Sequence, residues 1–143
     1  MIEAYFDGLC EPRNPGGVAT YGYVIYREGR KIHEGRGVAG TPNDPSSTNN
    51  VAEYTGIVRA MEHLVAEKLT GEPVVIRGDS QLVIRQATGE WKVKSRNLAA
   101  LNARVRELFF EFKELRFEWI PREKNREADA LTHLAYAEFP QSK

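Results

Sequence analysis

Four acidic residues stand where the chain is expected to change direction, and their placement suggests chemistry at phosphate groups. Asp7 ends a short apolar segment, Glu53 opens a long amphipathic one, Asp79 follows the run Val74–Arg77, and Asp129 lies near the start of the last helical pattern. Four carboxylates brought together would repel one another unless a cation lay among them. Mg²⁺ takes a few carboxylates together with water and phosphate oxygens, and two such ions form a clamp for in-line attack at phosphorus.

Each acid taken singly also has a purely structural explanation. Glu53 fits a capping box in which Asn50 is the N-cap and Glu53 the third helical residue. A turn residue, a cap of the next helix and a residue drawn to a helix dipole are the corresponding explanations for Asp7, Asp79 and Asp129. Only the joint pattern favours a metal site, and the alternatives stay open at this point.

Hydrophobic patterning predicts the elements that position these acids. Strands are expected over 3–7, 18–27, 31–38, 74–77 and 117–120, with loops over 10–17 and 40–47. Helices are expected over 54–69, 80–87, 98–112 and 125–139. The continuous apolar run Val74-Val75-Ile76 is typical of a strand buried on both faces. An antiparallel meander followed by alternating helices and strands predicts an α/β fold with a mixed sheet flanked by helices.

The bulk composition narrows the class of protein. The 143 residues fit a single domain spanning 1–143. One cysteine, Cys10, excludes an intramolecular disulfide, and its lack of Cys or His companions argues against a zinc site. No apolar run approaches the ~20 residues that span a membrane, and the N-terminus has no signal-peptide pattern, so a cytoplasmic protein is predicted.

The charge is balanced overall but not locally. Twenty basic residues face twenty acidic ones, so the protein lacks the global basic field that is usual in nucleic-acid binders. A local basic cluster without intervening acids is formed by Lys92, Lys94, Arg96, Arg104 and Arg106. It is either the solvated face of a helix or a rim that follows phosphates with salt-dependent affinity.

Four motifs, in order along the chain, resemble those of ribonuclease H, type 1. They are Asp7–Cys10 with Asn14–Gly17, then Ser47–Glu53, then Gly78–Val83, then Asn125–Leu131. The matches run from residue 3 to about 136, and four blocks in this order are highly specific. The resemblance implies a ribonuclease H-like mixed five-stranded sheet, with three antiparallel strands followed by parallel strands, flanked by helices. It also implies an endonuclease that hydrolyses the RNA strand of RNA–DNA hybrids.

The resemblance further implies how the four acids act. Asp7, Glu53, Asp79 and Asp129 would hold two Mg²⁺ ions, with Mn²⁺ as an alternative. One ion would activate a water and the other would stabilise the leaving 3′-oxygen. The products would carry 5′-phosphate and 3′-hydroxyl ends.

Hybrid contacts are implied at a second set of positions: Gly8, Cys10, Asn14, Thr48, Asn49, Asn50 and Gln81. Asn49, Asn50 and Gln81 would lie in the minor groove, the accessible groove of an A-like duplex. Asn14 and Thr48 would hold a DNA phosphate, and the backbone around Gly8–Cys10 would lie near RNA 2′-hydroxyls. Alternatively, these amides are ordinary turn, cap or exposed helix residues.

The chain departs from the family pattern in the loop before Asp129. Many members carry a histidine there, whereas residues 119–125 contain none, and Arg122 is the nearest candidate substitute. Its guanidinium could hold a phosphate or the product, but its pKa is too high for a general base. A surface ion pair is the alternative role. The three histidines, His33, His63 and His133, are interpreted as structural or surface residues.

A second departure concerns substrate binding. Larger members have an extra basic helix that grips the hybrid, whereas residues 89–96 here run almost directly into the next helix. Hybrid affinity would then either rest on Lys92, Lys94 and the surrounding basic cluster or be weak. Trp91 either stacks on a sugar near this rim or packs against the core, and the second is slightly favoured.

Three rival interpretations are less consistent with the sequence. A non-catalytic module predicts the loss of an acid, yet all four are present. An integrase, resolvase or 3′–5′ exonuclease would also use acids and two metals, but the Asn49-Asn50 pair before Glu53 and Gln81 after Asp79 favour ribonuclease H. A domain excised from a reverse transcriptase is disfavoured by the chain ends, so a free-standing monomeric enzyme acting on RNA–DNA hybrids is expected.

Overall fold

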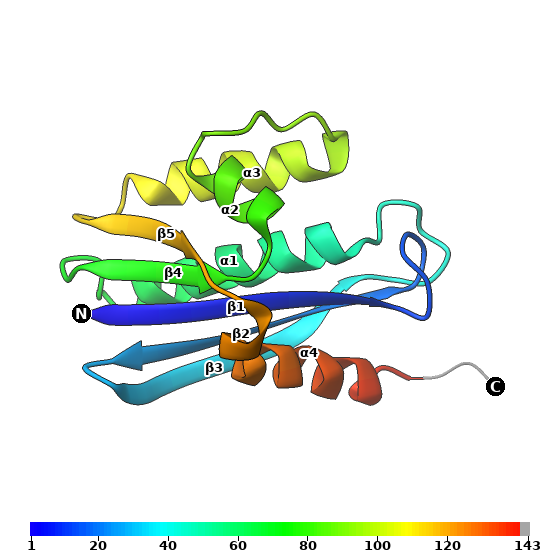
Figure 1. Ribbon diagram of the computed structural model, residues 1–143, viewed down its shortest axis with the longest axis horizontal. Helices are drawn as coiled ribbons and strands as arrows, with labels where there is room; N and C mark the ends of the chain where they lie inside the picture. The colour runs from blue at the N-terminus through cyan, green and yellow to red at the C-terminus, as the bar shows by residue number, and fades with distance from the viewer. Residues whose placement is uncertain (141–143) are drawn as a thin grey trace.

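The sheet is formed by segments in which β-branched and aromatic residues are frequent. The computed structural model describes residues 1–140 and has the strands β1 (Ile2–Glu11), β2 (Val18–Arg27), β3 (Arg30–Gly40), β4 (Val74–Gly78) and β5 (Leu115–Trp119). Their order in the sheet is β3-β2-β1-β4-β5 (Figure 1). The first three strands pair antiparallel, and β4 and β5 run parallel to β1 and β4. The predicted mixed five-stranded sheet is confirmed.

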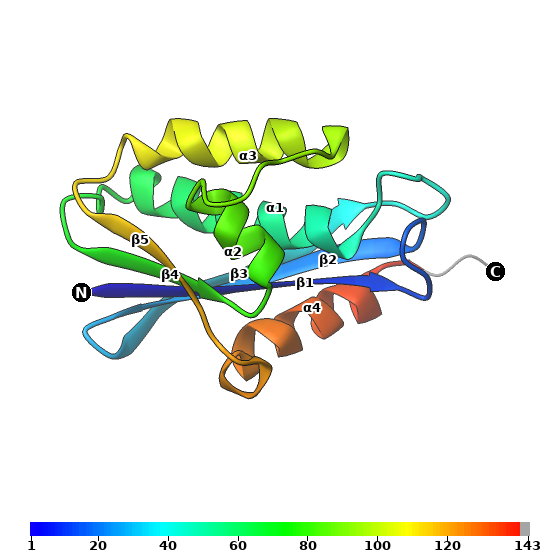
Figure 2. The same ribbon diagram turned by 45° about the horizontal axis from the view of Figure 1, so that its top comes forward.

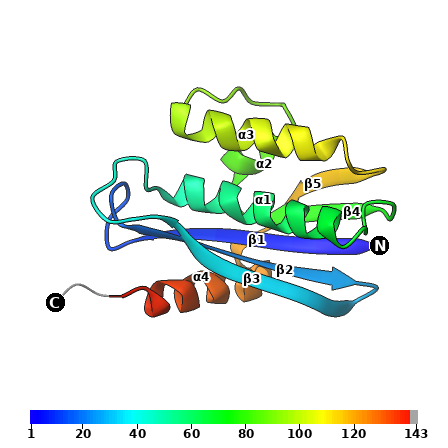
Figure 3. The same cartoon turned by 180° about the vertical axis from the view of Figure 1, so that it is seen from behind.

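The helices lie on both faces of this sheet. They are α1 (Asn49–Ala66), α2 (Gln81–Ala87), α3 (Arg96–Phe109) and α4 (Arg126–Glu138), with a 3₁₀ turn, η1 (Arg122–Lys124), before the last. Figures 1 and 2 show α1, α2 and α3 on one face and α4 on the other. Seen from behind, α3 packs along the outer side of α1 (Figure 3). No helix among residues 1–140 combines the length and apolar character needed to cross a membrane.

The main core lies between the sheet and α1. Ile57 and Met61 from the apolar stripe of α1 are fully buried against strand residues such as Phe6 and Ile76. All three residues of the run at 74–76 are at most 2% exposed, so the prediction of a strand buried on both faces is confirmed. A strand held in this way fixes the position of the residues that follow it.

Two predicted boundaries that bear on the acids were wrong. The first strand continues past residue 7 to Glu11, because β1 pairs with β2 residue by residue as far as Glu11 and Val18. The long helix begins at Asn49 and its N-cap is Thr48, whose side chain accepts a hydrogen bond from the Val51 N–H (3.1 Å). The apolar stripe marked only the core-facing residues and missed this polar first turn. The capping box with Asn50 as N-cap is therefore wrong, and Glu53 lies in the second turn.

Candidate active site

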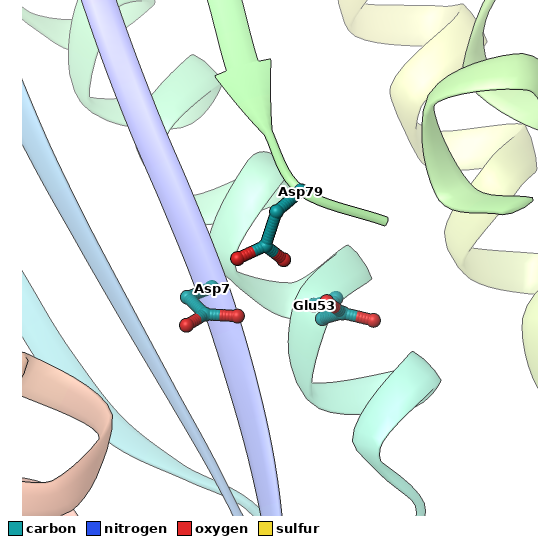
Figure 4. A group of neighbouring side chains, drawn as sticks. All are labelled: Asp7, Glu53 and Asp79. Atoms are coloured by element: carbon teal, nitrogen blue, oxygen red, sulfur yellow. The ribbon is translucent and has the colours of Figure 1, made fainter. Parts of the chain in front are cut away.

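Three carboxylates converge beside the end of β4 (Figure 4). Asp7 comes from β1, Asp79 directly follows β4, and Glu53 projects from α1. The parallel register places Tyr5 opposite Arg77, so Asp7 and Asp79 follow at the same level two residues later. One oxygen from each of the three carboxylates lies within 4.8 Å of the other two. The sheet register and one helix thus assemble the cluster.

The approach of α1 to β1 requires a glycine after Asp7. A Cβ on Gly8 would lie 2.5 Å from the Glu53 backbone nitrogen and 2.6 Å from its Cγ, which is too close for any side chain. Gly8 therefore allows the helix to bring Glu53 beside Asp7. The turn-pair explanation of Asp7 and Gly8 fails, because both residues lie within β1.

Burial and mutual repulsion disfavour full ionisation of these acids. Burial, followed by the charge of Asp79, raises the pKa of Asp7 to about 8. Burial raises the pKa of Glu53 well above its ordinary value, and Asp7 and Asp79 add to the effect. The Asp79 pKa is raised by burial, although a hydrogen bond from Asn125 and the Arg122 charge oppose the shift. A cation placed among the oxygens would reverse these tendencies.

One oxygen of the cluster also lacks a protein partner. Within residues 1–140, Glu53 Oε1 is buried and receives no hydrogen bond. Such an atom is costly unless something binds it. Hard carboxylate oxygens at this spacing suit Mg²⁺ or a similar divalent ion. The residues present therefore fit a metal site.

All four predicted acids line one cavity of about 420 Å³. Gly8, Asn49, Asn50 and Arg122 also form its wall. Asp129 lies outside the cluster of three and has a more exposed side chain, at 38%, although its charge contributes to the raised pKa of Asp7. A metal held by the cluster of three would therefore have Asp129 on its more open side.

A groove of about 780 Å³ adjoins this cavity at the start of α1. Its wall includes six of the predicted hybrid contacts, Asn14, Thr48, Asn49, Asn50, Lys92 and Lys94. Asn14 Nδ2 donates to Asn49 Oδ1 (2.7 Å), and the Asn49 N–H donates to Asn14 Oδ1 (3.3 Å), which ties the loop after β1 to the helix. Asn49 and Asn50 line both the cavity and the groove, so a strand bound in the groove could continue into the cavity.

Comparisons with known proteins give this site a family. A family model described as reverse transcriptase-like matches residues 6–135. The crystal structure of LC11-RNase H1 in complex with an RNA/DNA hybrid superposes with a TM-score of 0.85 at 37% identity, over 96% of this chain and 98% of that one. This chain belongs to the type 1 ribonuclease H family. The likeness extends through the strands and helices that carry the four acids.

Among curated relatives, the ribonuclease HI of Halobacterium salinarum is 35% identical over 134 residues, which is 94% of this chain and 63% of the relative. The bifunctional protein Rv2228c of Mycobacterium tuberculosis is 34% identical over 131 residues, 90% of this chain and 34% of the relative. This ribonuclease H chain thus spans less than two thirds of the length of these relatives.

Four residues at or beside the ribonuclease H site were given no site role by the sequence, or one that was not favoured: Trp91, His133, Asn125 and Trp119. Of the two positions considered for Trp91, the core was slightly favoured over the rim, yet Trp91 is 45% exposed, lines the groove and lies 5.5 Å from the Arg85 guanidinium. His133 was interpreted as structural or surface, and it forms part of the cavity wall with Nε2 3.6 Å from Asp129 Oδ1. The i, i+4 spacing from Asp129 was the signal that could have identified it.

Two further side chains hold the acid-bearing strands in place. Asn125 is 1% exposed, and its Nδ2 donates to the Phe6 carbonyl oxygen (2.9 Å) just before Asp7. Trp119 Nε1 donates to the backbone carbonyl oxygen of Asp79 (3.1 Å). These bonds tie the start of α4 and the end of β5 to the site. No local pattern indicated either contact.

Two predicted contact residues, Cys10 and Gln81, line neither the cavity nor the groove formed by residues 1–140. The Cys10 thiol is buried and lies 3.2 Å from the carbonyl oxygen of Arg13, and the Gln81 side chain accepts from Arg85 Nε (3.1 Å). The basic cluster also divides: Arg104 pairs with Glu62 and Glu107, so it belongs to a solvated helix face. Lys92 and Lys94 alone of that cluster line the groove.

Proposed function

We propose that this chain is an endonuclease that hydrolyses the RNA strand of RNA–DNA hybrids and leaves 5′-phosphate and 3′-hydroxyl ends. The observation that carries the proposal is the cluster of Asp7, Glu53 and Asp79, within 4.8 Å of one another, in a cavity that meets an amide-lined groove. The bound RNA/DNA hybrid of LC11-RNase H1, on a fold this similar, supports the choice of substrate.

Asp7, Glu53, Asp79 and Asp129 would hold two Mg²⁺ ions, with Mn²⁺ as an alternative. When bound, these ions would lower the pKa of a water and stabilise charge on the leaving 3′-oxygen. The unpartnered Glu53 Oε1 is free to act as a ligand. Arg122 lines the same cavity and its charge reaches Asp79, which suits it to hold the scissile phosphate or the product.

The groove would receive the rest of the duplex. Asn49 and Asn50 would contact base edges in the minor groove together with Gln81, while Lys92 and Lys94 would add phosphate contacts. The Thr48 hydroxyl accepts from the Val51 N–H, so its own hydrogen remains available for a DNA phosphate beside Asn14. The backbone at Gly8 and Cys10 would face the RNA 2′-hydroxyls.

Cleavage of an end-labelled RNA–DNA hybrid tests the proposal. The assay compares Mg²⁺, Mn²⁺ and EDTA, with Asp7→Asn as the matched variant, and includes RNA–RNA and DNA–DNA duplexes of the same sequence. Internal cuts in the hybrid RNA alone, lost with EDTA and with Asp7→Asn, are the expected result. A folded wild type that cuts nothing with either metal would contradict the enzyme assignment.

A further inference from the structure

A chain of buried hydrogen bonds ends on the segment that carries Lys92 and Lys94. Gln86 of α2 is 4% exposed, and its Nε2 donates to the Lys92 carbonyl oxygen (3.3 Å). Its Oε1 accepts from the Tyr54 hydroxyl of α1 (2.8 Å), which in turn accepts from Asn102 Nδ2 of α3 (3.2 Å). Three helices are thus joined through one amide to the loop between α2 and α3.

The direction of this hydrogen-bond chain follows from its far end. Arg106 can only donate, and its Nε lies 3.4 Å from Asn102 Oδ1, so Asn102 must turn its Nδ2 toward Tyr54. The Tyr54 oxygen then accepts, and its hydrogen goes to Gln86 Oε1. That leaves Gln86 Nε2 facing the Lys92 carbonyl. The orientation of the Gln86 amide is therefore set by a cation on α3.

The helix that supplies Tyr54 also supplies part of the groove lining. Asn49 and Asn50 lie in the first turn of α1, about one turn before Tyr54, and they line the same groove as Lys92 and Lys94 of the loop before α3. Gln86 also lines this groove. The hydrogen bonds from Tyr54 through Gln86 to Lys92 thus connect α1 to the loop that carries the two lysines.

We propose that Gln86 is a positioning residue for substrate binding, which holds residues 88–95 so that Lys92 and Lys94 face the strand in the groove. This role rests on the proposed function, since it concerns grip on the hybrid. The segment has other ties as well: the Trp91 N–H donates to the Arg85 carbonyl (3.1 Å), Arg85 pairs with Glu90 and lies beside the Trp91 ring, and the half-buried Val93 packs against the main core. Gln86 adds a buried polar side chain that bonds directly to the backbone of Lys92.

The test replaces Gln86 by methionine, which is similar in length but cannot donate to Lys92. With Mg²⁺ and the labelled hybrid, Gln86→Met should raise KM by about 3- to 10-fold and leave kcat within about 2-fold. The salt dependence of KM should flatten by up to about 2 in the log–log slope, because two phosphate contacts weaken. Hydrogen exchange of residues 88–95 in the free protein should become faster. Tyr54→Phe, which removes the hydroxyl that orients Gln86, should act in the same direction.

Leu108→Ala is the matched control, because Leu108 is buried in α3 but belongs neither to the hydrogen-bond chain nor to residues 88–95. It should leave KM and the exchange of residues 88–95 unchanged. In a Lys92→Ala, Lys94→Ala background, Gln86→Met should add no further rise in KM. The proposal is overturned if Gln86→Met leaves KM unchanged, or if its full effect persists without the two lysines.

The exchange measurement separates this inference from the proposed function. If the wild type cuts no hybrid, the enzyme assignment has failed, and the exchange of residues 88–95 still decides whether Gln86 holds the segment. Exchange in Gln86→Met that is no faster than in Leu108→Ala would overturn the positioning role in either case.

Discussion

The acid cavity and the groove meet at the start of α1, yet they are built in opposite ways. The cavity takes the buried Asp7 from β1 and the half-buried Asp79 from the end of the parallel strand β4, so their separation is set by the sheet. The groove takes residues both from loops, such as Asn14 and Lys92, and from helix starts, such as Asn49, and a side-chain amide contact joins Asn14 to Asn49. In the proposed function, the chemistry would depend on side chains placed by the sheet, and binding would depend largely on side chains from loops and helix starts. Changes in the cavity should act on kcat, and changes in the groove on KM.

The largest effect is expected from Glu53→Gln. This variant keeps the shape of the side chain but removes a charge and an oxygen of the proposed metal site, so kcat should fall by about 10³-fold or more. Because the amide carries no charge to bury, and none to repel Asp7 and Asp79, the metal-free protein should become more stable than the wild type. Steady-state kinetics and urea unfolding in EDTA check the two expectations. Glu62→Gln, farther along the same helix, is the control for charge removal and should leave kcat unchanged.

An effect of Glu53→Gln on KM alone would contradict the division between a catalytic cavity and a binding groove. If Glu53→Gln raised KM while kcat stayed within about 2-fold of wild type, Glu53 would bind substrate and would not take part in the chemistry. Calorimetric titration with Mg²⁺ provides an independent readout, since the variant should bind the ion more weakly even without nucleic acid.

The next largest effect is expected in the pH dependence of stability, which reports on the crowded carboxylates. The pKa of Asp7 rises from 3.8 to about 8 on folding, so the folded state keeps a proton that the unfolded state releases. In EDTA, the free energy of unfolding should therefore be highest at low pH and fall as the pH rises from about 4 to 8. Saturating Mg²⁺ should reverse the trend toward neutral pH, because the ion binds the ionised form. Urea unfolding at several pH values, with and without Mg²⁺, measures both.

Asp7→Asn serves as the control for that profile. It removes the shifted carboxyl without changing its size, so the loss of stability with rising pH in EDTA should become shallower. An unchanged slope would assign the effect to other groups and contradict the crowding of Asp7.

The two hollows also differ in how far the sequence predicted them. The acids were identified because each lies at the end of a patterned segment within a family motif, and the strand order then brings them together. The positions of Gln86 and Trp91 were not predicted. Their contacts with Tyr54, Asn102 and Arg85 arise only when three helices and a loop pack together. Periodicity predicts which face of a helix is buried, but it does not show which polar side chains meet there.

A smaller effect should follow from a change in the groove wall. Lys92→Ala removes one groove-lining ammonium, so KM should rise a few-fold and the log–log salt slope of KM should fall by about 1, with kcat unchanged. Lys31→Ala is the matched control: its ammonium pairs with Glu34 and Glu127 away from both hollows. Equal salt slopes in the two variants would show that Lys92 contacts no phosphate, and the groove would lose its assigned role.

The smallest effect is expected at a pair of histidines that lines neither the cavity nor the groove. There, the pH dependence of stability should have the opposite sign to that of the carboxylate cluster in EDTA. The rings of His33 and His63 stack at 3.6 Å, and burial, followed by the charge of His63, lowers the pKa of His33 below 6.5, with Glu34 and Glu67 opposing. The unfolded state then binds a proton first, so stability should decline as the pH falls below about 6.5. With Mg²⁺ saturating the acids, this acid-side loss should be about 1 kcal/mol or less and should shrink in His63→Gln. If the loss were as large in that variant, the acid-side decline would arise outside the histidine pair. If it vanished in the wild type, the pH profile of the whole protein would be that of the carboxylate cluster alone.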